Sequence, residues 1–119
     1  DLVRSTQTLP GQALLYRLTG DRNVIHADPD IALSLGYRVP ILHGSCTLGI
    51  ACREILAGVC AHDPTRMKSL GTRFTSVVYP GERIDTEIWI DGPQVRFRCR
   101  APERDAIVLD FGECRISAP

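Results

Sequence analysis

The sequence predicts an α+β domain in which an antiparallel sheet wraps around one long, buried helix. Helical patterns dominate the first half of the 119 residues, and strand patterns dominate the second half. The stretch 44–60 (GSCTLGIACREILAGVC) is the longest helical candidate. Small and apolar residues cover nearly every face of it, and Arg53 and Glu54 are its only charged residues. A helix of this composition needs a surface that surrounds it, and the strands that follow can supply one.

Two shorter helices are expected before the long one, at residues 11–19 and 29–35, with an irregular polar loop between them. Asp28 is typical of an N-cap, and Pro29 suits the first helical position because its missing N–H would have no partner there. Gly36 is a natural residue to end this helix.

Four strands are expected after the long helix, at residues 71–78, 83–91, 94–100 and 106–116. The third alternates most sharply, because apolar and arginine side chains take turns along it, which is typical of a half-buried antiparallel strand: Val95, Arg96, Phe97, Arg98, Cys99 and Arg100. The sequence Asp91-Gly92-Pro93 predicts a hairpin turn, and Gly112 marks a bulge in the last strand. One central helix wrapped by such a sheet is the hotdog architecture.

Composition excludes several classes of function. The formal net charge is zero, so nothing favours electrostatic capture of nucleic acid or of an anionic membrane. No apolar run approaches the roughly 20 residues of a membrane helix. The five cysteines are odd in number and include no Cys-x-x-Cys pair, which argues against a disulfide framework or a zinc site. The chain begins without Met or a signal-peptide pattern and is expected to be cut from something longer.

The loop between the short helices carries the candidate chemistry. Asp21, Asn23 and His26 fall within six residues, so a carboxylate and an imidazole can both reach one water. One group can then take a proton while the other gives one, and the Asn23 amide can orient the same water. These are also ordinary loop residues, so a purely structural loop is one alternative. A metal site made of Asp21, His26 and Asp28 is another, although the spacing matches no metal signature.

The start of the long helix is the second candidate region. A helix N-terminus offers free backbone N–H groups and partial positive charge. Gly44 lacks a Cβ, so a ligand oxygen can approach its N–H closely, as in an oxyanion hole for a thioester carbonyl. The alternative is that Gly44 only lets the helix begin tightly while His43 helps to cap it.

Taken together, residues 16–29 (YRLTGDRNVIHADP) and 40–49 (PILHGSCTLG) resemble the MaoC-like, (R)-specific enoyl-CoA hydratase family, also called hydratase 2. Arg73-Phe74 and residues 78–82 (VYPGE) add to a resemblance that covers nearly the whole chain. It is closest to the C-terminal half of the double-hotdog form. The resemblance implies that residues 1–119 form one catalytic hotdog domain, and that an absent N-terminal hotdog accommodates the acyl tail.

The resemblance also implies roles for site residues. Asp21 and His26 correspond to the acid/base pair, and Asn23 to the residue that helps to position the catalytic water. Gly44 corresponds to the source of the N–H that polarises the thioester carbonyl, and Phe74 to a side chain that contacts substrate. Val24 stands where the family usually has proline, which loosens the loop without removing a catalytic group.

The implied reaction is reversible addition of water to trans-2-enoyl-CoA, giving (R)-3-hydroxyacyl-CoA. No metal or redox cofactor is expected, because the thioester already acidifies the α-carbon. Alternatives are a dehydratase of fatty-acid synthesis that acts on acyl carrier protein, a steroid or branched side-chain CoA hydratase, and a non-catalytic hotdog that binds acyl-CoA.

A second hotdog is the expected partner, either an identical copy or the absent N-terminal half, because a lone hotdog exposes a sheet edge. Nucleic acid and membranes are not expected partners. A bacterial, cytoplasmic location is expected, with a peroxisomal one as the alternative.

Overall fold

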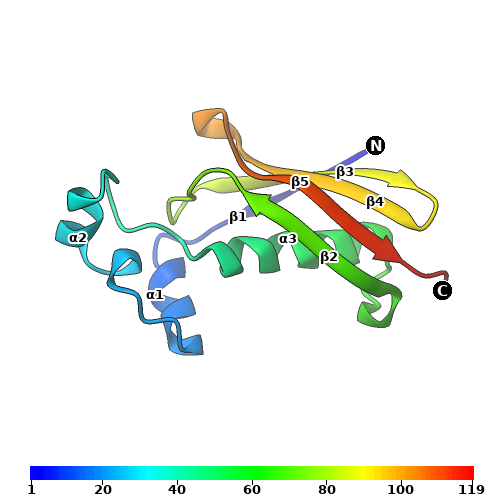
Figure 1. Cartoon of the computed structure of the whole chain (residues 1–119), viewed down its shortest axis with the longest axis horizontal. Coiled ribbons are helices and arrows are strands. Elements are labelled where there is room, and N and C mark those ends of the chain that lie inside the picture. Colours follow the sequence, from blue (N-terminus) through cyan, green and yellow to red (C-terminus); the bar gives the residue numbers. More distant parts are fainter.

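A computed structural model describes all 119 residues as a five-stranded antiparallel sheet with one long helix along one face (Figure 1). The helix is α3 (Gly44–Val59). The strand order is β1-β3-β4-β5-β2, so β1 and β2 form the two edges. The strands are β1 (Leu2–Gln7), β2 (Met67–Phe74), β3 (Arg83–Asp91), β4 (Gln94–Ala101) and β5 (Ala106–Ile116). The predicted α+β class and hotdog arrangement are confirmed.

The short helices α1 (Gln12–Tyr16) and α2 (Pro29–Ser34) lie together beyond the N-terminal end of α3, to the left in Figure 1. Asp28 caps α2 as predicted, because its Oδ1 accepts a hydrogen bond from the backbone N–H of Asp30 at 2.9 Å. Gly36 follows α2 with a φ of 91°, the left-handed conformation expected of a residue that ends a helix. These elements bring the polar loop to the start of α3.

The observed strands differ from the predicted ones in two places. β1 was not predicted, because its inward side chains include Arg4 and Thr6, which bind the buried Glu54 of α3 and hide the apolar alternation. The strand expected at 71–78 is β2, which begins and ends four residues earlier. Val77 and Val78 attracted the prediction, but they lie in the segment after β2, where the Val78 carbonyl accepts a hydrogen bond from the Leu42 N–H.

The bulge predicted at Gly112 is displaced by one residue. Phe111 carries the positive φ of 54°, and the pairing of β5 with both neighbours shifts at this point. Gly112 has a different role, because a Cβ there would lie 2.5 Å from the Phe97 carbonyl oxygen. The glycine therefore permits the close approach of β4 and β5.

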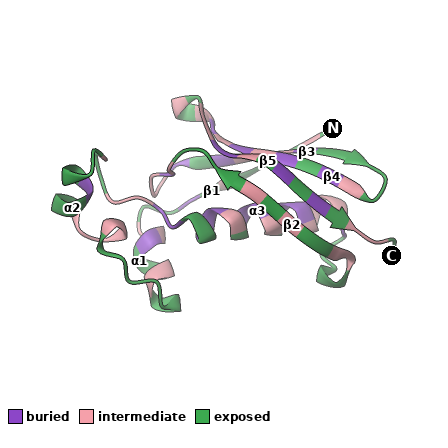
Figure 2. Cartoon of the chain, in the orientation of Figure 1, coloured by how far each residue is buried: buried purple, intermediate pink, exposed green.

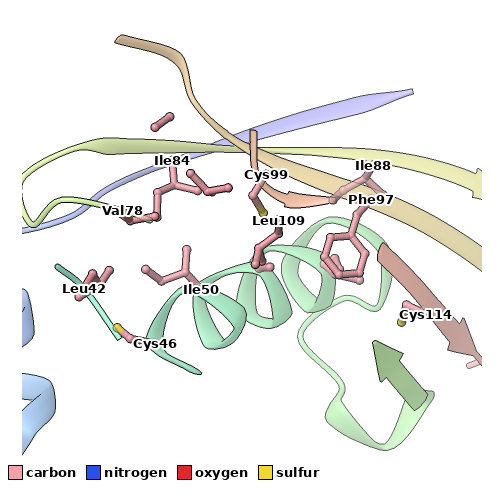
Figure 3. Close-up of a cluster of buried hydrophobic side chains, with 14 of the residues drawn as sticks. Leu42, Cys46, Ile50, Val78, Ile84, Ile88, Phe97, Cys99, Leu109 and Cys114 are labelled. Carbon is pink, nitrogen blue, oxygen red and sulfur yellow. The ribbon is translucent and has the colours of Figure 1, made fainter. Parts of the chain in front are cut away.

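The core lies between α3 and the concave face of the sheet. Figure 3 shows the helix residues Cys46 and Ile50 facing side chains of β3, β4 and β5, among them Ile84, Phe97 and Leu109. Burial is confined to this face of α3 (Figure 2), whereas Ser45, Gly49 and Arg53 are exposed. The predicted deep burial of the helix therefore holds for one side only, because the sheet of this chain covers one side of α3.

All five cysteines are free thiols, and Cys52 alone is only half-buried. The arginine row of β4 points away from the core, where Arg98 pairs with Glu87 and Arg100 with Asp105. None of the helices combines the length and the apolar character that a bilayer crossing requires.

Candidate active site

The polar loop and the start of α3 bring one carboxylate and two imidazoles together. A carboxylate oxygen of Asp21 and one ring nitrogen each of His26 and His43 all lie within 4.8 Å of one another. Asp21 is exposed, His26 is half-buried and His43 is buried. The predicted meeting of Asp21 and His26 is therefore present in the structure, and His43 joins them from a part of the chain that the prediction treated only as a cap.

A short 3-10 turn, Val24–His26, holds the His26 imidazole. The Asn23 side-chain oxygen caps this turn by accepting a hydrogen bond from the Ile25 N–H at 3.1 Å. His26 Nδ1 lies 2.7 Å from the Ile41 carbonyl oxygen, so in the neutral ring Nδ1 carries the proton and donates it. The other nitrogen, Nε2, then has a lone pair available, which is what a general base requires.

Asp21 and Asn23 are tied to each other within the loop. The Asn23 N–H donates to Oδ1 of Asp21 at 3.3 Å, which helps to fix the carboxylate. The Asn23 side-chain oxygen is engaged in capping, so only its amide NH₂ group is free to orient a water. The turn forms with Val24 at the position where the family usually has proline. Since valine does not fix φ as proline does, the capping hydrogen bond from Ile25 to Asn23 stabilises the turn.

His43 occupies the N-cap position of α3, but its side chain makes no capping hydrogen bond, contrary to the simpler expectation. Its ring stacks on the His26 ring with centroids 3.8 Å apart and an interplanar angle of 22°. Its Nε2 lies 3.2 Å from the main-chain carbonyl oxygen of Asp21. Burial lowers the pKa of the His43 imidazole, whereas the hydrogen bond to Asp21 acts in the opposite direction.

The first residue of α3, Gly44, offers a backbone N–H that no group in the chain accepts. The ring of Phe74 lies against this glycine, since a Cβ there would be 3.0 Å from Phe74 Cε1. Both residues line an apolar cavity of about 190 Å³ with Ile41, Thr47 and Leu109 among its walls. The predicted neighbours Gly44 and Phe74 are therefore together, and the helix supplies its N-terminal partial positive charge to this cavity.

The two halves of the predicted site lie on separate cavities. His26 lines a cavity of about 250 Å³ whose walls include Ala13, Ala27 and Pro40. It shares no wall residue with the cavity at Gly44 and Phe74. The link between the two regions is the chain itself, because His43 touches the Asp21/His26 pair and directly precedes Gly44.

The metal alternative that included Asp28 was wrong in its membership. Asp28 is engaged in capping α2, and His43 takes its place near Asp21 and His26. His26 Nδ1 and His43 Nε2 already face main-chain carbonyl oxygens, which leaves one ring nitrogen on each imidazole. His43 is the residue that sequence reasoning missed; its place next to Gly44 was visible, but its stacking on His26 depends on how the loop folds back.

Known proteins are similar to this chain in sequence and in fold. The family model described as "MaoC like domain" matches residues 1–109. Peroxisomal enoyl-CoA hydratase 2 of Arabidopsis thaliana is 48% identical over 107 residues, which cover 90% of this chain and 35% of that protein. The crystal structure of a MaoC-like dehydratase from Phytophthora capsici is 42% identical with a TM-score of 0.96, covering 98% of this chain and 40% of that one.

A further structure shows the fold alone, at 17% identity. It is the ChsH1–ChsH2 complex from Mycobacterium tuberculosis, which superposes with a TM-score of 0.73 over 98% of this chain and 94% of the matched chain. This chain spans little more than a third of the Arabidopsis relative's length. Since the family model covers residues 1–109 and the fold agrees throughout, the chain belongs to the family of MaoC-like domains.

Proposed function

We propose that this chain catalyses the reversible hydration of trans-2-enoyl-CoA to (R)-3-hydroxyacyl-CoA. The observation that carries the proposal is the meeting of the Asp21 carboxylate and the His26 imidazole at the start of α3. The relative at 48% identity is named for this activity, which supports the choice of an enoyl-CoA substrate. The family resemblance supplies the (R) configuration.

In the proposed mechanism, a water held between Asp21 and His26 attacks C3 of the enoyl thioester. The new C–O bond forms at C3 while one member of the pair takes a proton from the water and the other member gives a proton to C2. Transfer of the first proton to the group that gave one up returns the pair to its starting state. His26 Nε2 is suited to accept a proton because Nδ1 is held as a donor by Ile41. Dehydration uses the same groups in reverse.

Charge that develops on the thioester oxygen needs a donor, and the Gly44 N–H is the candidate. It is free, it begins a helix of 16 residues, and the apolar cavity at Phe74 would exclude water from it. Such a donor and the helix dipole both act more strongly on the enolate-like transition state than on the ground-state carbonyl. Phe74 would contact the substrate next to this carbonyl.

The test is hydration of crotonyl-CoA, followed by loss of the absorbance of the conjugated thioester. Asp21→Asn and His26→Ala should each lower kcat at least about 10²-fold, from loss of acid/base catalysis. Asp30→Asn, a change of an exposed aspartate on α2, is the matched control and should leave kcat unchanged. Near-normal hydration by either site variant would overturn the assignment.

The same assay separates the competing functions. A carrier-protein dehydratase would turn over acyl carrier protein thioesters faster than CoA thioesters, and a steroid or branched side-chain hydratase would prefer those acyl groups. A non-catalytic hotdog would bind a substrate analogue without turnover. Each of these results would replace the proposed substrate or the proposed reaction.

We also propose that a second hotdog completes the molecule, either an identical copy or an N-terminal half. The edge strand β2 has one neighbour only, and Phe74 at its end is 58% exposed although it contacts Gly44. The open face of α3 is a further surface that a partner can cover. The mass of the native assembly distinguishes a homodimer from a double hotdog. We propose a cytoplasmic location, with a peroxisomal one as the alternative because the Arabidopsis relative is peroxisomal.

A further inference from the structure

His43 is the most buried residue of the candidate site, and it contacts both Asp21 and His26. Its side chain is 1% exposed, so substrate in the cavities does not reach it without rearrangement. One face of its ring stacks on His26. Tyr16 packs at a 52° tilt with ring centroids 4.7 Å away, and donates its hydroxyl to Ser45 at 3.0 Å. The His43 ring is therefore held within a packed aromatic group at the start of α3.

Asp21 itself is attached to the rest of the chain through His43. Asp21 makes one hydrogen bond inside the loop, with the Asn23 N–H. The bond from His43 Nε2 to the Asp21 carbonyl oxygen is the one hydrogen bond that ties Asp21 to a residue outside the loop. Without it, the exposed Asp21 carboxylate would be held near the His26 ring only by the hydrogen bond from the Asn23 N–H.

The His26 ring depends on His43 in a different way. The hydrogen bond from Nδ1 to the Ile41 carbonyl fixes one atom of the ring but leaves its tilt free. The His43 ring, nearly parallel at 3.8 Å, fixes that tilt and so directs Nε2. The two contacts together define the plane of the imidazole, which is what a general base must have before substrate arrives.

The chemistry of His43 itself favours a fixed, neutral ring. Because Nε2 carries the proton and donates to the Asp21 carbonyl, Nδ1 is unprotonated and carries a lone pair. Nδ1 is buried without a hydrogen-bond partner. A buried polar atom without a partner costs about 1–3 kcal/mol, so a phenyl ring would pack here at lower cost. The donor at Nε2 is what a phenyl ring lacks, and it is the reason for a histidine at this position.

From these contacts we propose that His43 is a positioning residue, which sets the distance between the Asp21 carboxylate and the His26 imidazole without touching the substrate. It does so through a hydrogen bond to the main-chain carbonyl oxygen of Asp21 and a ring stack on His26. Its role as a positioning residue for hydration rests on the proposed function, whereas its effect on His26 does not.

The first measurement needs no variant and uses the full natural protein. Proton–nitrogen NMR correlation of the imidazole rings reports which nitrogen carries the proton in each of the three histidines. The proposal requires His43 with its proton on Nε2 and neutral His26 with its proton on Nδ1. His43 with its proton on Nδ1 would overturn the proposal whether or not the protein hydrates enoyl-CoA.

Two variants then separate the two contacts. His43→Phe keeps a ring for stacking and removes the donor to Asp21, whereas His43→Gln keeps an amide donor and removes the stack. Each should lower kcat for crotonyl-CoA about tenfold or more, with KM changed less than about threefold, because the reacting groups are misplaced while the substrate surfaces remain. His43→Gln should also mix the two His26 tautomers. The matched control is His62→Gln, at the exposed turn beyond the far end of α3.

The outcomes distinguish the two proposals. If the wild-type protein hydrates crotonyl-CoA but the folded variants match it in kcat and in the His26 spectrum, the positioning role is wrong and the proposed function stands. If the wild-type protein is inactive while His43→Gln still changes the His26 tautomer, the proposed function fails and the positioning of His26 stands. If His43 were purely structural, the two variants would have a lower melting temperature than the wild-type protein. Their His26 tautomer and kcat would be unchanged.

Discussion

Substitution of Gly44 by alanine tests the oxyanion donor with little disturbance of the fold. The added methyl would lie 3.0 Å from Cε1 and 3.2 Å from Cδ1 of Phe74, on the side where both residues line the apolar cavity. Phe74 is 58% exposed, so its ring can move by the few tenths of an ångström that the methyl requires. The methyl then occupies the space through which a thioester oxygen approaches the Gly44 N–H.

The expected effects on stability and on activity have different magnitudes. Alanine is tolerated at the first position of a helix, and the exposed Phe74 ring can move aside, so the melting temperature should change little. Loss of one oxyanion donor lowers kcat by about 10²-fold or more. That corresponds to about 3 kcal/mol of transition-state stabilisation, well above the change in folding free energy.

The assay is kcat and KM for crotonyl-CoA, measured beside a thermal melt. Gly49→Ala is the matched control, because Gly49 lies in the same helix and a Cβ there would meet nothing within 4 Å. Its activity should equal that of the wild-type protein and its melting temperature should rise slightly. If Gly44→Ala were as active as Gly49→Ala, the thioester oxygen would not use the Gly44 N–H, and the helix-terminus part of the mechanism would be refuted.

Three further predictions concern the packing, the charges and the chemistry of the chain. Gly112→Ala places a Cβ 2.5 Å from the Phe97 carbonyl oxygen and should destabilise the fold, whereas Gly71→Ala in β2, with open space around its Cβ, should not. Overpacking of this kind costs about 1–3 kcal/mol, which a denaturant titration resolves, and equal midpoints for the two variants would contradict it. Burial alone would raise the pKa of Glu54, but hydrogen bonds from Arg4 and Thr6 outweigh it and hold the pKa below its usual range. Ionised Glu54 therefore stabilises the fold at neutral pH, and this contribution is lost as the pH falls through the lowered pKa. Glu54→Gln should therefore show a weaker loss of stability in acid, and an acid denaturation curve unchanged from wild type would contradict this assignment. Addition of a chelator should leave hydration unchanged, and a large loss of activity would revive a metal role for the Asp21, His26 and His43 cluster.

Sequence patterns predicted the strands whose inner faces are mainly apolar and failed where a buried charged group is paired across the core. β3 and β5 begin and end where they were expected, because apolar side chains alternate along them. β1 was missed because Arg4 and Thr6 face inward to bind Glu54, so its inner face reads as polar. A buried ion pair of this kind becomes visible only when strand and helix are placed side by side.

Among the residues of the candidate site, some were also predictable from the sequence and one was not. Asp21 and His26 were predictable because one short loop carries both, and Gly44 because a helix begins there. His43 was not, because its role arises from a ring stack with His26 and a hydrogen bond to Asp21, both across long stretches of chain. Adjacent residues at the start of α3 thus face two ways: the Gly44 main chain faces the Phe74 cavity, and the His43 side chain faces the acid/base loop. A shift of this helix end would therefore displace both halves of the site together.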